Sequence, residues 1–181
     1  RKFEQANDVA LYLIDVGVES PQNFALGDLQ LSSETLPENS GLTVRTTISC
    51  VGKGATRAVE LYVEDVDSTL PVERDDQVIL PTSRLQSREE VQLEANGSQE
   101  IAFSLPGLAP GTRHATMRLV GQDGLMVDNA RYFSVLVRKA WLVLVIAPSD
   151  VNTSAFVEAL APYEHRMAGR AAFECLVITP E

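Results

Sequence analysis

The sequence predicts a mainly β protein, in which an antiparallel β-sandwich over residues 7–138 is followed by a partial α/β segment over residues 139–181. Two observations support this prediction. Short segments with alternating apolar and polar residues follow one another along the first part of the chain, as in half-buried antiparallel strands. After Lys139 the apolar residues instead run unbroken from Trp141 to Ala147, which is typical of a strand buried on both faces. Two architectures therefore meet near Arg138 and Lys139.

The expected sandwich strands are short and separated by residues that favour turns. Glycine supplies positive φ, proline fixes φ, and Asn or Asp bonds the local backbone. Asn96-Gly97, between two alternating segments, predicts a β-hairpin. Strands spaced this closely, with no helical period between them, favour a sandwich. The expected strands are Val9–Val18, Ala25–Leu31, Leu42–Cys50, Arg57–Val66, Gln77–Leu80, Glu90–Leu93, Gln99–Leu105, Arg113–Val120 and Arg131–Arg138.

The tail is expected to hold a strand, a helix and a second strand. The run that opens at Trp141 is the first strand, and a helix begins around Asn152–Ser154, where a polar side chain can cap it. Pro162 discourages continuation of the helix, and Phe173–Ile178 is the second buried strand. This is the size of one βαβ unit. We expect the first part of an α/β domain that continues beyond Glu181; the alternative is an appendage packed on the sandwich.

Composition narrows the classes of function. The 181 residues carry 15 basic and 25 acidic side chains, a net charge of −10, which opposes binding to nucleic acid or to an anionic membrane surface. The hydrophobic content of 45% is that of a folded protein. Cys50 and Cys175 are the only cysteines, so we expect no disulfide framework or zinc motif, and Cys50 is expected to be a buried thiol. The longest apolar run is too short to span a bilayer.

Two parts of the sequence resemble a known family. Leu108–Val120, Asp123 and Asp128–Val135 resemble the last hairpin of CARDB-type immunoglobulin-like domains. Leu11–Gly17, with an apolar strand directly after the last hairpin, resembles the middle region of bacterial BatA-like membrane proteins. In the second comparison the residues that follow also match, namely Pro21, Asn23, Ala25 and Leu26.

The resemblance covers about Leu11–Leu160 and implies an immunoglobulin-like β-sandwich. In BatA-like proteins a membrane anchor and a von Willebrand A-type domain precede an extracytoplasmic sandwich, and a glutamine-amidotransferase-like α/β domain often follows. The aspartate-serine-serine metal site of the von Willebrand A domain is absent here. So is the nucleophile elbow of an amidotransferase, because Cys175 falls inside an expected strand. The resemblance therefore implies a location and a domain order, and transfers no active site.

The residues singled out around the last expected strand are interpreted as structural. Asp128 and Asn129 precede it, and both side chains can hold a turn by bonding backbone N–H groups. Arg131 is a candidate ion-pair partner for Asp128 or for Asp15. A surface ligand site is the alternative. No catalytic, cofactor-binding or metal-binding residue is assigned, and no cofactor is expected.

The sequence offers little support for three kinds of chemistry. Calcium bound by converging loops is one, but no calcium-binding loop motif is present. His114 and His165 have no carboxylate or serine at motif spacing, so a catalytic triad is not expected. Glycine-rich phosphate-binding loops are missing. The aspartates considered as calcium ligands are Asp65, Asp67, Asp75, Asp76, Asp123 and Asp128.

The sequence thus favours a non-catalytic spacer and protein-interaction module in the extracytoplasmic part of a membrane-anchored bacterial protein. Loops such as Asp67–Asp76 and Gly121–Asn129 are expected at the ends of the sandwich. A protein partner of unknown identity is expected, with no nucleic acid and no membrane contact by this part of the chain. One alternative is a carbohydrate-binding or adhesion module, in one version organised by calcium. Another is an accessory domain of an enzyme whose active site lies beyond residue 181.

Overall fold

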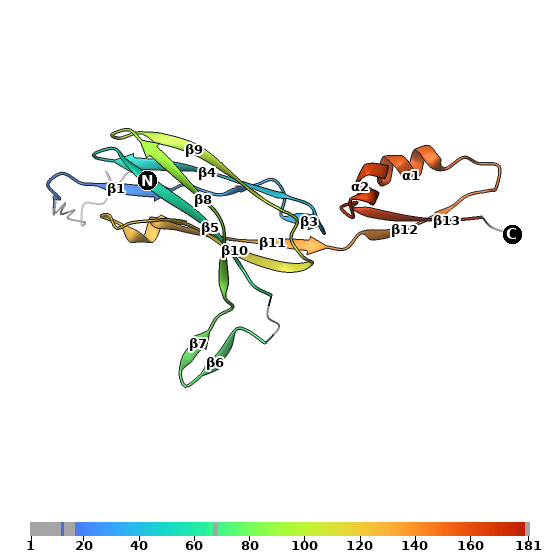
Figure 1. Cartoon of the computed structure of the whole chain (residues 1–181), viewed down its shortest axis with the longest axis horizontal. Coiled ribbons are helices and arrows are strands. Elements are labelled where there is room, and N and C mark those ends of the chain that lie inside the picture. Colours follow the sequence, from blue (N-terminus) through green and yellow to red (C-terminus); the bar gives the residue numbers. More distant parts are fainter. Residues whose placement is uncertain (1–11, 13–16, 67–68, 180–181) are drawn as a thin grey trace, which may run out of the picture.

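Two antiparallel sheets packed face to face form the larger part of the molecule (Figure 1). The computed structural model describes residues 12, 17–66 and 69–179. Strand β4 pairs with β1 and β2 along one edge and with β9 along the other. The second sheet has the order β3-β11-β10-β5-β8, antiparallel except where β3 runs parallel to β11. The first sheet consists of β1 (Asn23–Leu26), β2 (Gln30–Leu31), β4 (Leu42–Val51) and β9 (Ser98–Leu105). The second consists of β3 (Thr35–Pro37), β5 (Ala55–Glu64), β8 (Ser83–Leu93), β10 (Gly111–Leu119) and β11 (Ala130–Arg138), with the 3₁₀ helix η1 (Met126–Asn129) before β11.

The core lies between the two sheets and follows from the alternation of the strands. In β4 the residues at every second position from Leu42 to Cys50 are buried, and the side chains between them are exposed or half-buried. The same period places Leu61 of β5 and Met117 of β10 fully inside. Burying one large apolar side chain stabilises the fold by about 1.5–3 kcal/mol. The sequence prediction of a mainly β sandwich is confirmed. The largest fully buried side chains are Phe24, Phe103, Leu26, Leu42, Ile48, Leu61, Leu93 and Met117.

The hairpin predicted at Asn96-Gly97 is wrong. The strands on either side belong to different sheets, because β8 pairs with β5 and β9 pairs with β4. The turn is anchored on the neighbouring Gly52 turn instead: Asn96 Oδ1 accepts from the Gly52 N–H at 2.8 Å. Asn96 has φ of +53°, so the prediction of a turn at this position is correct. The predicted pairing of the two flanking strands is wrong.

A two-stranded hairpin, the arm, leaves the second sheet between β5 and β8 and projects away from the sandwich (Figure 1). It consists of β6 (Val72–Arg74) and β7 (Gln77–Ile79). Asp75 and Asp76 join the strands with φ of +52° and +58°, the paired positive values of a tight hairpin turn. The predicted strand Gln77–Leu80 therefore exists in the arm and not in the sandwich.

Other predicted strands differ in their bounds. Ala25–Leu31 is divided into β1 and β2, because its register on β4 shifts by one residue between the pair Leu26–Ile48 and the pair Gln30–Arg45. Glu90–Leu93 is only the end of the longer β8. The short strands β3 and β6 were not predicted. The predicted strand Val9–Val18 lies largely outside the described residues. Gly17 and Val18, which are described, are not in a strand.

The tail forms the predicted βαβ arrangement, which we call the tail unit. It comprises β12 (Trp141–Ile146), α1 (Ser154–Leu160), α2 (Tyr163–Met167) and β13 (Phe173–Ile178). The two strands are parallel and in register over their whole length. The helix start was predicted correctly, since Asn152 Oδ1 accepts from the Ser154 N–H at 2.9 Å. Helix α2, directly after Pro162, was not predicted, and it contains His165.

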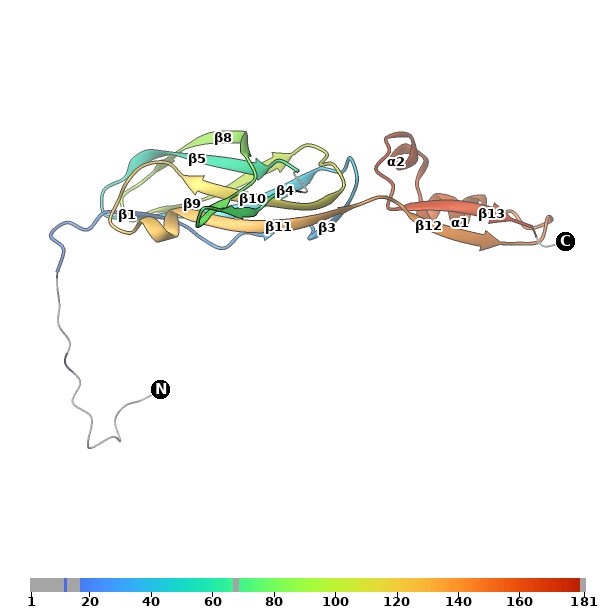
Figure 2. The ribbon, with the colours of Figure 1, turned by 90° about the horizontal axis from the view of Figure 1, so that it is seen from below.

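The expectation that β12 is buried on both faces is wrong for this chain. Val143 and Val145 are half-buried on the inner face, and both helices lie to one side of the strands (Figures 1 and 2). The opposite face of β12 is open, and Leu144 is 53% exposed. The open face consists of Leu142, Leu144 and Ile146 of β12 with Glu174, Leu176 and Ile178 of β13.

Candidate functional site

The solvent side of the five-stranded sheet carries a concentrated set of aromatic and polar side chains. These residues alternate with core residues along three neighbouring strands, so all of them point away from the core. The strand register places Tyr62, Thr116 and Tyr132 opposite one another in a single row. We call this surface the outer face. It consists of Glu60, Tyr62 and Glu64 of β5, His114 and Thr116 of β10, and Tyr132 and Ser134 of β11.

Tyr62 is fixed in place by its neighbours. Its hydroxyl donates to Glu60 Oε2 at 2.7 Å, and Arg88 Nη1 donates to Glu60 Oε1 at 2.8 Å. The Arg118 guanidinium lies 5.8 Å from the centre of the Tyr62 ring. The hydrogen bond to Glu60 raises the pKa of Tyr62 above its ordinary value of 10.0, with burial as a second cause. Tyr132, at the other end of the row, is 77% exposed, so its ring is presented to solvent.

His114 and Ser134 are cross-strand neighbours on the outer face. Nδ1 of His114 lies 2.7 Å from Oγ of Ser134. This pair was missed in the sequence because it arises from strand register and not from sequence spacing. A nucleophilic triad also needs a carboxylate hydrogen-bonded to the histidine. The bonds described for His114 include none, although Glu64 lines the same hollow.

Two hollows meet on this side of the molecule and share Glu64 and His114. One, of about 420 Å³, lies over the outer face, between Thr116 and the side chains of Tyr132 and Ser134. The other, of about 400 Å³, extends to the base of the arm, where it is lined by Leu70, Pro71, Leu80 and Pro81. Because the two hollows share Glu64 and His114, we refer to them together as the arm groove. It joins an aromatic sheet surface to an apolar corner.

Charge and exposed apolar surface border the arm groove. Asp65 lines its arm end and pairs with Arg84, whose Nε lies 2.8 Å from Asp65 Oδ2. Along the arm, Val78 is 63% exposed, and Leu80 is similarly exposed. Apolar side chains held outside a core in this way are typical of interaction surfaces.

The residues proposed from the sequence as turn formers lie elsewhere, at the end of the sandwich where β1 begins. Asp128 accepts from Asn23 Nδ2 at 2.9 Å, and the buried Asn129 donates to Asp123 Oδ1 at 3.1 Å. Arg131 directs Nη1 to the Ala130 carbonyl at 3.0 Å, not to Asp128. Asp15, the other partner considered for Arg131, lies outside the described residues.

Cys50 is buried, as expected, and its Sγ lies 3.2 Å from the Lys53 carbonyl oxygen. Within the described ranges, no three His, Cys, Asp or Glu side chains gather as a group that could hold a metal ion. In that same part of the chain, no helix is both long and apolar enough to cross a membrane.

Comparison with known proteins gives no family assignment. No protein-family model matches the chain, and no curated protein matches it. Several solved structures are similar at low sequence identity. The CARDB domain of a Pyrococcus furiosus protein, crystallised in complex with di-metal ions, has a TM-score of 0.49 and 10% identity, covering 67% of this chain and 97% of that domain.

β-Glucosidase structures are also similar. The enzyme from Erythrobacter marinus has a TM-score of 0.48 and 17% identity, covering 65% of this chain. The enzyme from Listeria innocua has a TM-score of 0.44 and 20% identity, covering 64%. This chain spans 16% of the length of either enzyme. The assignment of a β-sandwich rests on the strand pairing of this chain and not on these similarities.

Proposed function

We propose that this chain is a non-catalytic module that positions and binds another protein. The observation that carries the proposal is the arm groove, where the arm and the outer face adjoin through Glu64 and His114. An exposed tyrosine, paired prolines and open apolar side chains provide rigid contact area of the kind that dominates protein interfaces. The sandwich beneath supplies a fixed support.

The proposed setting is the extracytoplasmic part of a membrane-anchored bacterial protein. Its support is the sequence resemblance to BatA-like proteins around Asp128–Val135 and Leu11–Gly17. The net charge of −10 favours a partner with a basic surface. In the same proposal the tail unit is the beginning of an α/β domain, supported by its parallel strands and its apolar open face.

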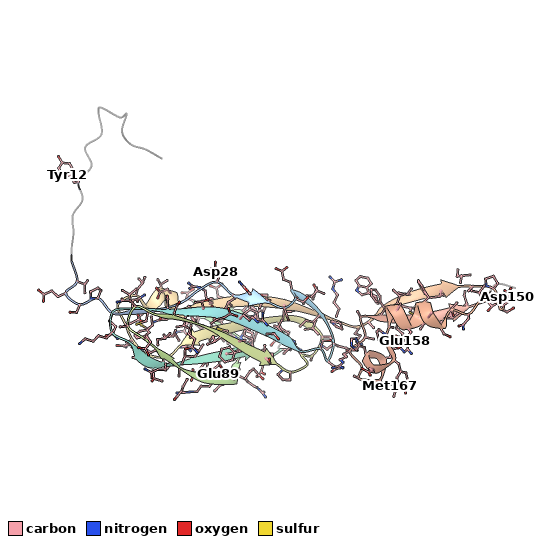
Figure 3. All side chains as sticks on the ribbon, turned by 90° about the horizontal axis from the view of Figure 1, so that it is seen from above. Tyr12, Asp28, Glu89, Asp150, Glu158 and Met167 are labelled. Atoms are coloured by element: carbon pink, nitrogen blue, oxygen red, sulfur yellow. The ribbon has the colours of Figure 1, made fainter. Side chains whose placement is uncertain are left out.

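Site-specific photo-crosslinking in the producing cell tests the interaction. A photoreactive residue is placed at Tyr132 or Val78, and at Asp28 as the control. Asp28 lies in the loop between β1 and β2, and it is on the opposite side of the sandwich from Glu89 (Figure 3). We expect the same discrete adduct from Tyr132 and Val78 and none from Asp28. Adducts of equal yield at all three positions, or at none, would contradict the proposal.

Carbohydrate binding is a second candidate, and the row of Tyr62 and Tyr132 favours it. The two tyrosines lie two strands apart on one sheet face, and aromatic faces are suitable surfaces for the apolar faces of sugar rings. This aromatic row arises from strand register, which the sequence alone does not show. A glycan array probed with the wild type and with Tyr132→Ala tests it. Glycan binding by the wild type that is lost in Tyr132→Ala supports carbohydrate binding. If the wild type binds no glycan on the array, carbohydrate binding is excluded.

A further inference from the structure

Four side chains at the end of the sandwich form a closed ring of contacts that ties β1 to η1 and to the loop before it. Asn23, at the start of β1, donates to Asp128 of η1, and Asn129 donates to Asp123. Asp123 Oδ2 in turn accepts from the backbone N–H of Phe24 at 3.1 Å. Because Asn23 precedes Phe24 and Asp128 precedes Asn129, the ring closes through the backbone.

Three buried oxygens in this ring have no hydrogen-bond partner. They are the Oδ1 atoms of Asn23, Asp128 and Asn129, and no other buried side-chain nitrogen or oxygen in the described part of the chain lacks one. Asn129 is only 4% exposed. Buried polar groups are normally satisfied, so three orphans in one connected cluster call for a ligand.

The missing ligand must supply positive charge or hydrogen-bond donors to oxygen. Exchanging the amide oxygen and nitrogen of Asn23 or Asn129 does not remove the orphans, because each Nδ2 already donates to a carboxylate. A single water molecule has two protons to donate and so cannot serve three acceptors. A cation, in contrast, is coordinated by several oxygen ligands at once.

The donor set is that of a hard divalent cation. Carboxylate and amide oxygens are the ligands that Ca²⁺ takes from proteins, and the ring contains no sulfur or imidazole that would favour a softer metal. No ion pair among the described residues neutralises Asp123 or Asp128. With two carboxylates, the charge in the ring is compatible with weak binding of a divalent ion.

We propose that Asn23, Asp128 and Asn129 bind a calcium ion through their Oδ1 atoms, with Asp123 as the positioning residue that holds the Asn129 amide. Water or main-chain carbonyls complete the six to eight ligands that calcium requires. The ion would clamp the beginning of β1 to η1, so it acts on the sandwich itself and is independent of the partner proposed for the arm groove. With few carboxylates, the expected Kd is about 10⁻⁴–10⁻³ M.

The test is thermal unfolding of the 181-residue chain followed by circular dichroism, with CaCl₂ added to about 10 mM. MgCl₂ and NaCl at equal ionic strength control for screening of the net charge. At ten times Kd, we expect calcium to raise the Tm by roughly 3–5 °C. Asp128→Asn should abolish the shift, whereas Asp75→Asn, the same change on the arm, should preserve it.

A second variant keeps the proposal testable if Asp128→Asn does not fold. Asn23→Asp adds a carboxylate and removes the donor to Asp128, so the calcium-free protein should melt earlier and the calcium response should grow, with Kd lowered roughly tenfold. The proposal is overturned by no calcium shift, by an equal shift with magnesium or sodium, by a shift that survives Asp128→Asn, or by an unchanged response in Asn23→Asp.

Discussion

The sandwich and the tail unit bury their apolar residues in different ways. In the sandwich, two sheets cover each other, and Phe24, Phe103 and Leu61 are almost completely enclosed. In the tail unit, two helices cover one face of two strands, and the only buried apolar residues described there are Ala147 and Ala161. Leu144 and Leu176, which face each other on the open side, are half exposed.

This difference indicates where the stability of the chain resides. Stability depends on apolar area removed from water, which the sandwich achieves with its own strands. The tail unit has strand residues as apolar as those of the sandwich but no second layer over its open face. The single tryptophan, Trp141, lies in β12, so its fluorescence reports on the tail unit, while circular dichroism is dominated by the sandwich.

The largest effect is expected from Phe103→Ala, in the core between the sheets. Removing a fully buried ring should lower the free energy of unfolding of the sandwich by about 3–5 kcal/mol. In urea, we expect the circular dichroism transition to move to lower concentration while the Trp141 fluorescence transition moves much less. Two transitions that shift together would show that the sandwich and the tail unit unfold as one cooperative unit. Phe156→Ala, on the exposed side of α1, is the control.

Asp123→Ala should have the next largest effect on the sandwich. It leaves the buried N–H of Phe24 and the amide of Asn129 without their acceptor, at a cost of about 2–3 kcal/mol. Urea unfolding of the calcium-free protein measures this loss separately from any ion. A change within experimental error would mean that water replaces the carboxylate at this end of the sandwich.

Leu144→Ala, on the open face, should change the free energy of unfolding of the tail unit by less than about 1 kcal/mol. The side chain is already half exposed, so little burial is lost and no cavity forms. The Trp141 transition in urea is the measurement. A loss as large as that of Phe103→Ala would indicate that the open face is covered in solution, and repeating the titration at several protein concentrations would reveal self-association.

The smallest effect concerns Tyr62 and appears only at high pH. Its folded pKa is raised above the ordinary 10.0, so the neutral hydroxyl contributes stability that is fully present below pH 10 and is lost as the pH rises through the folded pKa. Ultraviolet titration of the four tyrosines should show a late-ionising component that Tyr62→Phe removes and Tyr132→Phe retains. A late component that persists in Tyr62→Phe would assign it elsewhere.

The sequence predicts those features that depend on local period. Alternation in Leu42–Val51 identifies both the strand and its buried face, and the unbroken run after Trp141 identifies a change of architecture. Parallel pairing of the tail strands follows from a helix between them. Three-residue strands such as β3 are too short to show a period, and the length of β8 is obscured by its mostly exposed polar residues.

Features that depend on which strands pair were not predicted. The turn at Asn96 has the chemistry of a hairpin, yet its strands separate into opposite sheets. For the same reason the outer face was missed, because Tyr62 and Tyr132 meet through β10, which lies between their strands. In the ring at Asp123 and Asp128, the aspartates were noticed from the sequence, but Asn23 joins them only through the packing of β1.

Strand β11 continues into β12 with only Lys139 and Ala140 between them. Beside the end of β11, β3 runs parallel, and the Glu38 N–H bonds the Arg138 carbonyl at 2.8 Å. A force that pulls the tail unit along β11 therefore acts in shear on the hydrogen bonds to β3 and β10. In this geometry the bonds must break together and not one after another. Tension along β11 would therefore strain the whole sheet before it could peel away a strand.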